Sequence, residues 1–269
     1  QRSASGIVKV VQTGGSSAMG PKNESLDWIE HLEELRKRLF VILLAVALAS
    51  TFAAFFTDTF LKFLIHPIRP LQEKLYFLTP YEAFLVKVGV VIFAGILMAS
   101  PVIFAQLWRF VAPGLYEKEK KVLAAACATT LGFFLAGVAF GFFIALPFAL
   151  KFLLGFQSPE LAPLISLKEY FSFLNVLLLG FGAAFCFPVF ILLLVRLGIL
   201  RAEVLIRQRK IAVVLIFIIA AVLTPPDVLS QLLLAFPLLG LYELTVVLAR
   251  RLESKLAEKN ILKEFTSSF

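Results

Sequence analysis

The stretch VLAAACATTLGFFLAGVAFGFFIALPFAL, residues 122–150, carries no charged side chain along its 29 residues. A helix needs about 20 apolar residues to cross the hydrocarbon core of a bilayer. Similar uncharged runs cover residues 39–56, 88–108, 170–195, 211–223 and 228–242. The last two are short, and the turn-forming segment 224–227 separates them as a hairpin. The sequence therefore predicts an all-α integral membrane protein with six transmembrane helices.

Composition supports the same class of protein. Hydrophobic residues make up 60% of the chain and the mean hydropathy is +0.91, whereas soluble domains average roughly 45–50% apolar residues. The two cysteines, Cys127 and Cys186, fall inside apolar runs, so neither a disulfide framework nor a metal site is predicted. The sequence also lacks the motifs of zinc hydrolases, phosphate-binding loops and serine hydrolases, so it predicts neither an enzyme nor a cofactor.

Prolines interrupt several of the predicted spans and shape the expected bundle. Pro101, Pro147, Pro188 and Pro237 lie within apolar runs, where proline bends or breaks a helix. Gly182 allows close helix approach in the fourth run. We expect a curved, open bundle.

The distribution of positive charge predicts the orientation. Of the 26 lysines and arginines, 20 lie on the side of the N-terminus and 6 on the other side when the six spans alternate. Cytoplasmic loops carry the excess of lysine and arginine, so both termini are predicted to be cytoplasmic. The net charge of +8 is then a topology signal and does not predict a nucleic-acid partner. We expect residues 1–23 to be a flexible tail or a cloning remnant, residues 24–251 the membrane domain, and residues 252–269 a cytoplasmic tail.

Three predicted helix starts on the outer side share one pattern. In Thr79–Glu82, Ser166–Glu169 and Thr224–Asp227 a hydroxyl precedes a carboxylate by three residues. This spacing is typical of a capping box, in which the two side chains satisfy free N–H groups of the first turn. The connections before the first two caps are long and contain prolines, so we expect structured outer loops rather than tight turns.

Acidic residues stand out on the otherwise basic cytoplasmic side. The segment DWIEHLEELRKRL, residues 27–39, places Trp28, Leu32, Leu35 and Leu39 on one helical stripe, which predicts a segment that lies at the membrane interface before the first span. The first cytoplasmic loop has a Pro-Gly turn followed by Glu117 and Glu119.

Three separated motifs together resemble the TatC family, the signal-peptide receptor of twin-arginine protein translocation. They are HLEELRKRL at residues 31–39, WRFVAPGLYEKEKK at 108–121 and LTPPDVLSQLLLAFPLLGLYEL at 223–244. The resemblance covers residues 27 to 251. It implies a bacterial inner-membrane protein that binds twin-arginine signal peptides of folded cargo and forms an oligomeric complex with TatB. The resemblance also implies that the protein recruits TatA, and that this step is driven by the proton-motive force and consumes no nucleotide.

The resemblance also implies a binding site. The arginine-binding carboxylates of the family fall on Glu34 and Glu119; the alternatives are an ion pair of Glu34 with Arg38 and a solvated loop charge at Glu119. Phe110, Pro113 and Leu115 match the family loop and either shape the binding groove or anchor the loop at the headgroups. Arg36 is a binding residue in this hypothesis and a membrane-flanking cation in the alternative.

Other positions match the family pattern with less defined roles. Pro67 is a turn former in the first outer loop. Asp227 and Gln231 belong to the PPDxxSQ segment. Glu243 either has a functional role or extends its carboxylate to the cytoplasmic edge of the membrane beside Arg250. At Cys186 the family commonly carries a glutamate, so a mechanism that requires this carboxylate does not apply here. A polytopic secondary transporter, with Asn175 as a polar intramembrane group, is the alternative function.

Overall fold

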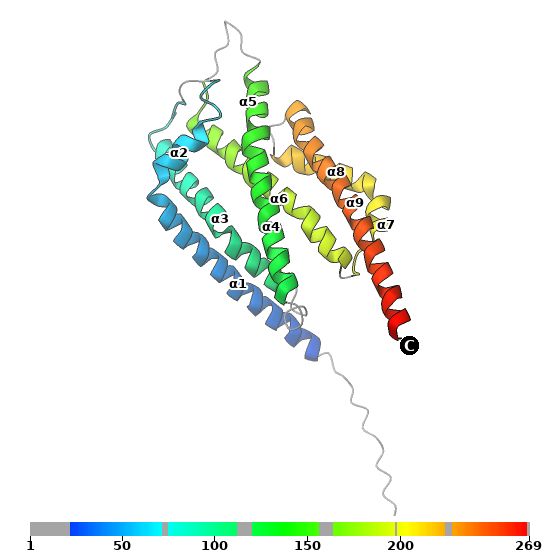
Figure 1. Cartoon of the computed structure of the whole chain (residues 1–269). Coiled ribbons are helices and arrows are strands. Elements are labelled where there is room, and N and C mark those ends of the chain that lie inside the picture. The colour runs from blue at the N-terminus through cyan, green and yellow to red at the C-terminus, as the bar shows by residue number, and fades with distance from the viewer. Residues whose placement is uncertain are drawn as a thin grey trace, which may run out of the picture.

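The computed structural model describes residues 22–71, 75–111, 120–155, 164–196, 198–223 and 228–267, which are largely helical (Figure 1). In order, the elements are α1 (Lys22–Ala54), α2 (Thr57–Ile65), α3 (Glu82–Val111), α4 (Lys120–Phe140), a π-helix (Gly141–Ala145), α5 (Leu146–Leu154), α6 (Leu167–Arg196), α7 (Ala202–Arg207), α8 (Arg209–Leu223) and α9 (Val228–Ser267). The predicted all-α class is confirmed for these residues.

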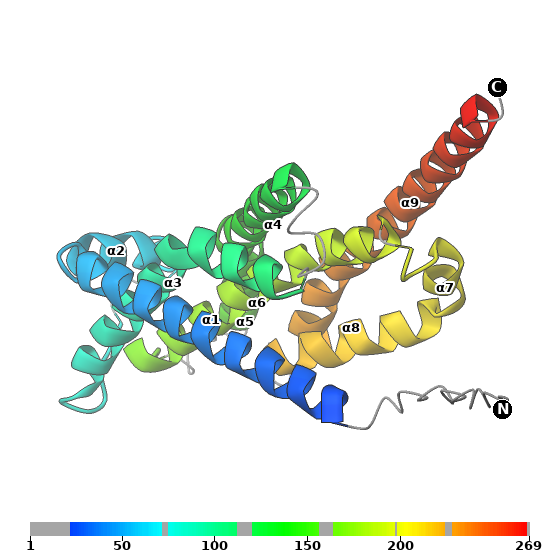
Figure 2. The ribbon, with the colours of Figure 1, turned by 90° about the horizontal axis from the view of Figure 1, so that it is seen from below.

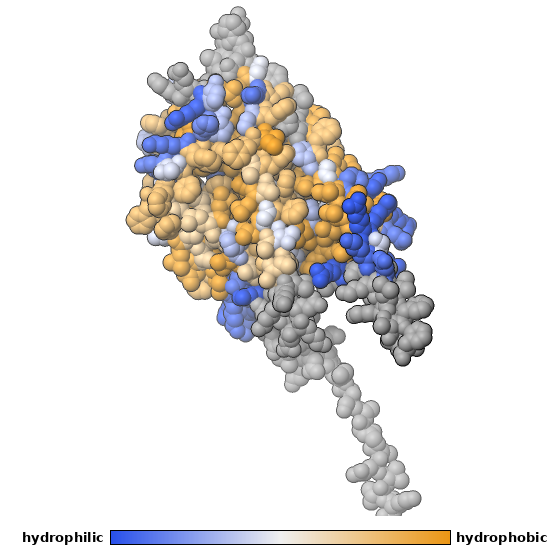
Figure 3. All heavy atoms as spheres, in the orientation of Figure 1, coloured by the Kyte–Doolittle hydropathy of each residue, from blue (hydrophilic) through white to orange (hydrophobic). Residues whose placement is uncertain are grey.

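Four segments are long and apolar enough to cross a membrane: His31–Ala54, Glu82–Phe110, Ala124–Leu154 and Leu167–Arg196. Figure 3 shows an apolar surface across the middle of the molecule, with hydrophilic side chains gathered near α2 at one end and near α7 at the other. These features define a multi-pass membrane protein. The predicted hairpin corresponds to α8 and α9, which pack against each other; their crossing of the bilayer stays a prediction.

The first helix continues through the boundary that the charge pattern predicts. α1 runs from Lys22 to Ala54 without a break, and Figures 1 and 2 show it as one rod beside α3. Residues 27–39 are therefore continuous with the first apolar span; their position at the membrane interface stays a prediction. Leu32, Leu35 and Leu39 remain exposed along this segment, which leaves their apolar stripe available to lipid or a partner.

Small residues set the two closest helix crossings. A Cβ added at Gly95 of α3 would lie 2.0 Å from the Oγ of Ser50 on α1. A Cβ added at Gly137 of α4 would lie 2.5 Å from the carbonyl oxygen of Phe181 on α6, and one at Gly182 would lie 2.6 Å from Phe134. The prediction that Gly182 permits close approach is confirmed, and small residues play the role expected of them in membrane bundles.

The largest buried cluster lies around α6. Leu174 and Phe181 of α6 are at most 1% exposed, and they pack with Leu64 of α2, Val90 of α3 and Leu146 of α5. The same cluster includes side chains from α8 and α9. A continuous core thus joins the N-terminal and C-terminal halves of the chain.

Proline and a π-helix lie in the second half of the candidate span Ala124–Leu154. Pro147 cannot donate a hydrogen bond and its ring clashes with the carbonyl group four residues earlier in a regular α-helix. The preceding turn, Gly141–Ala145, is wound as a π-helix, which widens the helix locally. The helix continues into α5 after this turn, so Pro147 modifies the span without ending it.

The described parts of the two connections that the charge pattern places outside contain helix and backbone pairing. α2 fills part of the first connection. Tyr76 then pairs with Ser166 in an isolated parallel bridge, in which the Tyr76 N–H donates to Ile165 at 3.1 Å and the Leu167 N–H donates to Tyr76 at 2.7 Å. Backbone hydrogen bonds therefore hold the segment at Tyr76 beside the start of α6.

Hydrogen bonds to the Glu82 carboxylate connect the same two segments. Glu82 is 2% exposed and its carboxylate accepts hydrogen bonds from the N–H groups of Leu78 at 2.7 Å and Thr79 at 3.4 Å, which confirms the carboxylate half of the capping box predicted for α3. It also accepts from the Ser166 hydroxyl and from the Lys168 N–H at 2.7 Å. At the start of α6 the Ser166 hydroxyl accepts from the Glu169 N–H at 3.5 Å, as the predicted cap requires. The carboxylate of this cap is Glu82 and not the predicted Glu169, because tertiary packing brings the two helix starts together.

Candidate functional site

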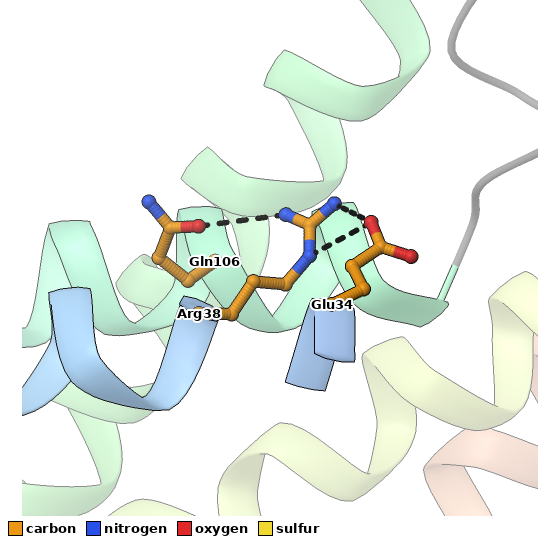
Figure 4. A network of polar contacts seen from close by, with 3 residues as sticks. All are labelled: Glu34, Arg38 and Gln106. Carbon is orange, nitrogen blue, oxygen red and sulfur yellow. Dashed lines mark hydrogen bonds and ion pairs between the residues drawn. The ribbon is translucent and has the colours of Figure 1, made fainter. Parts of the chain in front are cut away.

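The side chain of Glu34 meets a guanidinium group one helical turn later on α1. The Arg38 Nε donates to Glu34 Oε1 at 3.1 Å, and Arg38 Nη2 donates to the same oxygen (Figure 4). The Glu34 side chain is 36% exposed and the Arg38 side chain 18% exposed. The alternative prediction of an ion pair between residues four apart is confirmed: the Glu34 carboxylate accepts from its own chain's Arg38 guanidinium group.

A second helix contributes to this site. The Arg38 Nη1 points to Gln106 of α3 and lies 3.4 Å from its Oε1, on the side away from Glu34 (Figure 4). The distance is at the long end for an N–H···O hydrogen bond, so the contact is weak in this arrangement. Arg38 therefore bridges α1 and α3, with a charged acceptor on one side and a neutral acceptor on the other.

An aromatic contact closes the same end of the two helices. The rings of His31 on α1 and Phe110 on α3 are stacked, with centroids 4.4 Å apart and planes inclined by 20°. His31 is exposed and precedes Glu34 by three residues, so both side chains lie on the same face of α1. The structure thus brings Phe110, predicted from the family loop, close to the predicted carboxylate.

The remaining predicted binding residues are only partly described. Arg36 is exposed on α1. Glu119, Pro113 and Leu115 lie outside the described residues, between the end of α3 at Val111 and the start of α4 at Lys120. Their roles therefore stay predictions.

Cys186 lies among main-chain acceptors in the packed interior of α4 and α6. Its Sγ is 3.3 Å from the carbonyl oxygen of Gly182 and 3.8 Å from that of Thr130. Close by, the Trp108 Nε1 donates to the Thr130 hydroxyl at 2.9 Å. The thiol behaves as a small, half-buried group whose nearest polar neighbours are carbonyl oxygens.

Pro67 lines a groove between α2 and the π-helix. The groove has a volume of about 710 Å³ and includes Phe63, Phe142, Pro147 and the exposed lysines Lys62 and Lys151. Phe63 and Phe142 stack there with centroids 4.7 Å apart. A turn-forming role for Pro67 agrees with its position just after α2.

The polar residues of the last two helices hold α8 and α9 together. The Gln231 Nε2 donates to the carbonyl oxygen of Phe217 at 3.0 Å. Near the opposite end, Arg209 donates to Glu243 at 2.9 Å, so the described partner of Glu243 is Arg209 and not Arg250. Asp227 lies outside the described residues. Gln231 therefore has a structural contact, whereas Glu243 sits in an exposed ion pair.

The chemistry of the described residues is that of binding. No group of three or more histidine, cysteine or acidic side chains is arranged to hold a metal ion in the part of the chain that the structure describes. A carboxylate that accepts two hydrogen bonds from one guanidinium group is instead suited to arginine recognition.

Two contributors to the site escaped the sequence analysis. Gln106 is an uncharged residue within an apolar run, and His31 is only the first residue of the HLEELRKRL motif. Both positions become informative only when α1 is laid beside α3, because their partners are far away in the sequence: Gln106 lies 68 residues from Arg38. An amide inside an otherwise apolar span is the signal that could have indicated Gln106.

The fold and the site define a multi-pass helical membrane protein with a carboxylate–guanidinium site at the end of its first and second long helices. The family model for the Sec-independent protein translocase protein (TatC) matches residues 30–237. The chain belongs to the TatC family.

Relatives and solved structures agree with this assignment. The Sec-independent protein translocase protein TatC of Carboxydothermus hydrogenoformans is 40% identical over 235 residues, which are 87% of this chain and 97% of that protein. The TatC protein of Aquifex aeolicus is 37% identical, over 82% of this chain and 93% of its own length. A crystal structure of the twin-arginine translocase receptor TatC superposes with a TM-score of 0.75 at 36% identity, covering 82% of this chain and 99% of that one.

Proposed function

We propose that this protein is the receptor of a bacterial twin-arginine export system, and that it binds signal peptides at the cytoplasmic ends of α1 and α3. Glu34 and Glu119 accept the two guanidinium groups, while Arg36, Phe110, Pro113 and Leu115 line the groove. The observation that carries this proposal is that the Glu34 carboxylate accepts hydrogen bonds from two nitrogens of the Arg38 guanidinium group. Membership of the TatC family supports it.

The wider function follows from the same proposal. The chain spans the cytoplasmic membrane six times with both termini inside, assembles with TatB and recruits TatA under the proton-motive force. It contributes binding and no catalysis. The excess of lysine and arginine on the predicted inner side supports this orientation, since 20 of 26 lie there.

Peptide binding to the whole chain in lipid nanodiscs tests the proposal. A labelled peptide with two arginines is compared with the same peptide carrying two lysines, because lysine cannot reproduce the planar donor fork of arginine. Glu34→Gln and Glu119→Gln are each expected to weaken binding of the arginine peptide, and the double variant to abolish it.

Glu33→Gln is the matched control. Glu33 is the neighbouring carboxylate on α1, is 59% exposed and pairs with Lys37 at 3.9 Å, away from the Arg38 site. Its replacement removes the same charge and is expected to leave peptide affinity nearly unchanged. Equal binding of both peptides to the unaltered protein, or equal loss in the Glu33 and Glu34 variants, would contradict the proposal.

A further inference from the structure

We propose that Arg38 is an internal competitor for the signal peptide: it occupies Glu34 in the free receptor and transfers its guanidinium group to Gln106 when a peptide arginine binds. This inference rests on the proposed function and adds a step to it. The observation behind it is the placement of one guanidinium group between two acceptors from different helices.

The first step of the argument concerns charge. In the free protein, Arg38 neutralises Glu34, and its two donors converge on a single carboxylate oxygen. A peptide arginine that approaches this neutral pair gains little attraction, and it would bring a second positive charge beside Arg38. Binding at Glu34 therefore requires that Arg38 withdraw.

The second step concerns where Arg38 goes. Its side chain is only 18% exposed, so a released guanidinium group that found no acceptor would leave its donors partly desolvated. Gln106 supplies an oxygen that already lies 3.4 Å from Nη1, and a small rotation of the arginine toward α3 would shorten this distance. Because an amide is uncharged, Gln106 can hold Arg38 without attracting the peptide.

The third step concerns the effect on affinity. A ligand that binds one state of a two-state site has its affinity reduced by the fraction of molecules in that state. Every peptide that needs Glu34 bears the same reduction, whether it carries arginine or lysine. Arg38 thus lowers the affinity of every such peptide. Peptides that bind tightly still occupy the site, whereas the weaker lysine peptides occupy only a small fraction of the receptors.

Four proteins in nanodiscs form the test: the unaltered chain, Arg38→Met, Gln106→Leu and the double variant. We expect Arg38→Met to tighten binding of both the arginine and the lysine peptide by the same factor, about threefold to tenfold for a partly buried ion pair. Gln106→Leu is expected to weaken both, because the displaced Arg38 loses its acceptor. In the Arg38→Met background the Gln106 substitution is expected to have no effect.

Two further variants separate competition from other effects. Lys37→Met removes one positive charge from the next position, where the lysine side chain is 72% exposed, and measures the general electrostatic contribution; its effect is expected to be smaller than that of Arg38→Met. Arg38→Lys keeps the charge without the planar fork, and its affinity is expected to lie between those of the unaltered chain and Arg38→Met.

The outcomes distinguish this inference from the function on which it rests. If the unaltered chain binds the arginine peptide through Glu34 but Arg38→Met binds it equally or more weakly, Arg38 orients Glu34 instead of competing for it, and the inference is wrong. A Gln106 effect that persists without Arg38 also overturns it. If Glu34→Gln has no effect on the unaltered chain, the proposed function itself fails and the competitor with it.

Discussion

Glu82 and Ser166 lie 84 residues apart in the sequence, and the Ser166 hydroxyl donates a hydrogen bond to the Glu82 carboxylate. The buried Glu82 side chain thus accepts hydrogen bonds from backbone N–H groups at the starts of both α3 and α6. The two helices are thereby fixed relative to each other at the end of α3 that lies opposite the proposed peptide site.

Replacing Glu82 with glutamine tests this junction. The carboxylate accepts four hydrogen bonds on two oxygens, and an amide would turn an NH₂ group toward some of those donors. We expect Glu82→Gln to lower the midpoint of thermal unfolding in nanodiscs, measured by tryptophan fluorescence. Glu169→Gln is the control, since Glu169 is exposed at the same helix start. A similar midpoint for both variants would show that Glu82 does not fasten the two helices.

The crossing of α4 and α6 predicts opposite effects for two glycines of one helix. At Gly137 an added methyl group would meet the backbone oxygen of Phe181 at 2.5 Å, so Gly137→Ala is expected to cost about 1–3 kcal/mol in the free energy of unfolding. A methyl group added at Gly132 would meet no neighbouring atom within 4 Å, so Gly132→Ala is expected to stabilise the helix by roughly 0.5–1 kcal/mol. Equilibrium unfolding in mixed micelles measures both, and a neutral Gly137→Ala would rule out this close approach.

Thr130 supplies the hydrogen-bond acceptor of a buried tryptophan. Trp108 is 3% exposed, and its Nε1 lies 2.9 Å from the Thr130 hydroxyl. Thr130→Val keeps the side-chain shape and leaves the indole N–H without that acceptor, which is expected to cost about 1–3 kcal/mol. The exposed neighbour Thr129 gives the control Thr129→Val. The same unfolding experiment applies, together with a shift of the Trp108 emission; equal stability of the two variants would contradict the prediction.

The environment of Cys186 predicts that a glutamate at this position is not tolerated in this chain without other changes. The nearest polar atoms are the carbonyl oxygens of Gly182 and Thr130, which repel a carboxylate and offer it no donor. We expect Cys186→Glu to lower the yield of folded protein and its unfolding temperature. Cys186→Ser, whose hydroxyl can donate to these carbonyl groups, is expected to be close to the unaltered chain. A fully stable glutamate variant would mean that a donor outside these contacts reaches the position.

The long apolar runs made the membrane class predictable, because a helix in hydrocarbon satisfies its own backbone and needs little help from its neighbours. The run at 122–150 corresponds to a helical span at Ala124–Leu154, and the run at 170–195 to one at Leu167–Arg196. The cap at Glu82 and the i, i+4 partner of Glu34 were also within reach of the sequence, since both depend on residues at most four positions away.

Contacts across the bundle were out of reach for the opposite reason. Nothing near Glu82 in the sequence indicates that Ser166 and Lys168 share its carboxylate. Likewise, Glu243 was expected beside Arg250, one or two turns along the same helix, whereas the structure pairs it with Arg209 of α8. The partner of such a side chain depends on which helices lie side by side.

The amino-acid sequence by itself determined that this protein is a helical membrane protein of the TatC family, because span length, charge bias and three ordered motifs are local properties of the chain. The tertiary structure alone decided which acceptors surround Arg38, since Gln106 comes within 3.4 Å of it only when α1 and α3 pack together. Local periodicity fixes where helices form, whereas side-chain shape and close approach at residues such as Gly95 and Ser50 decide how they meet.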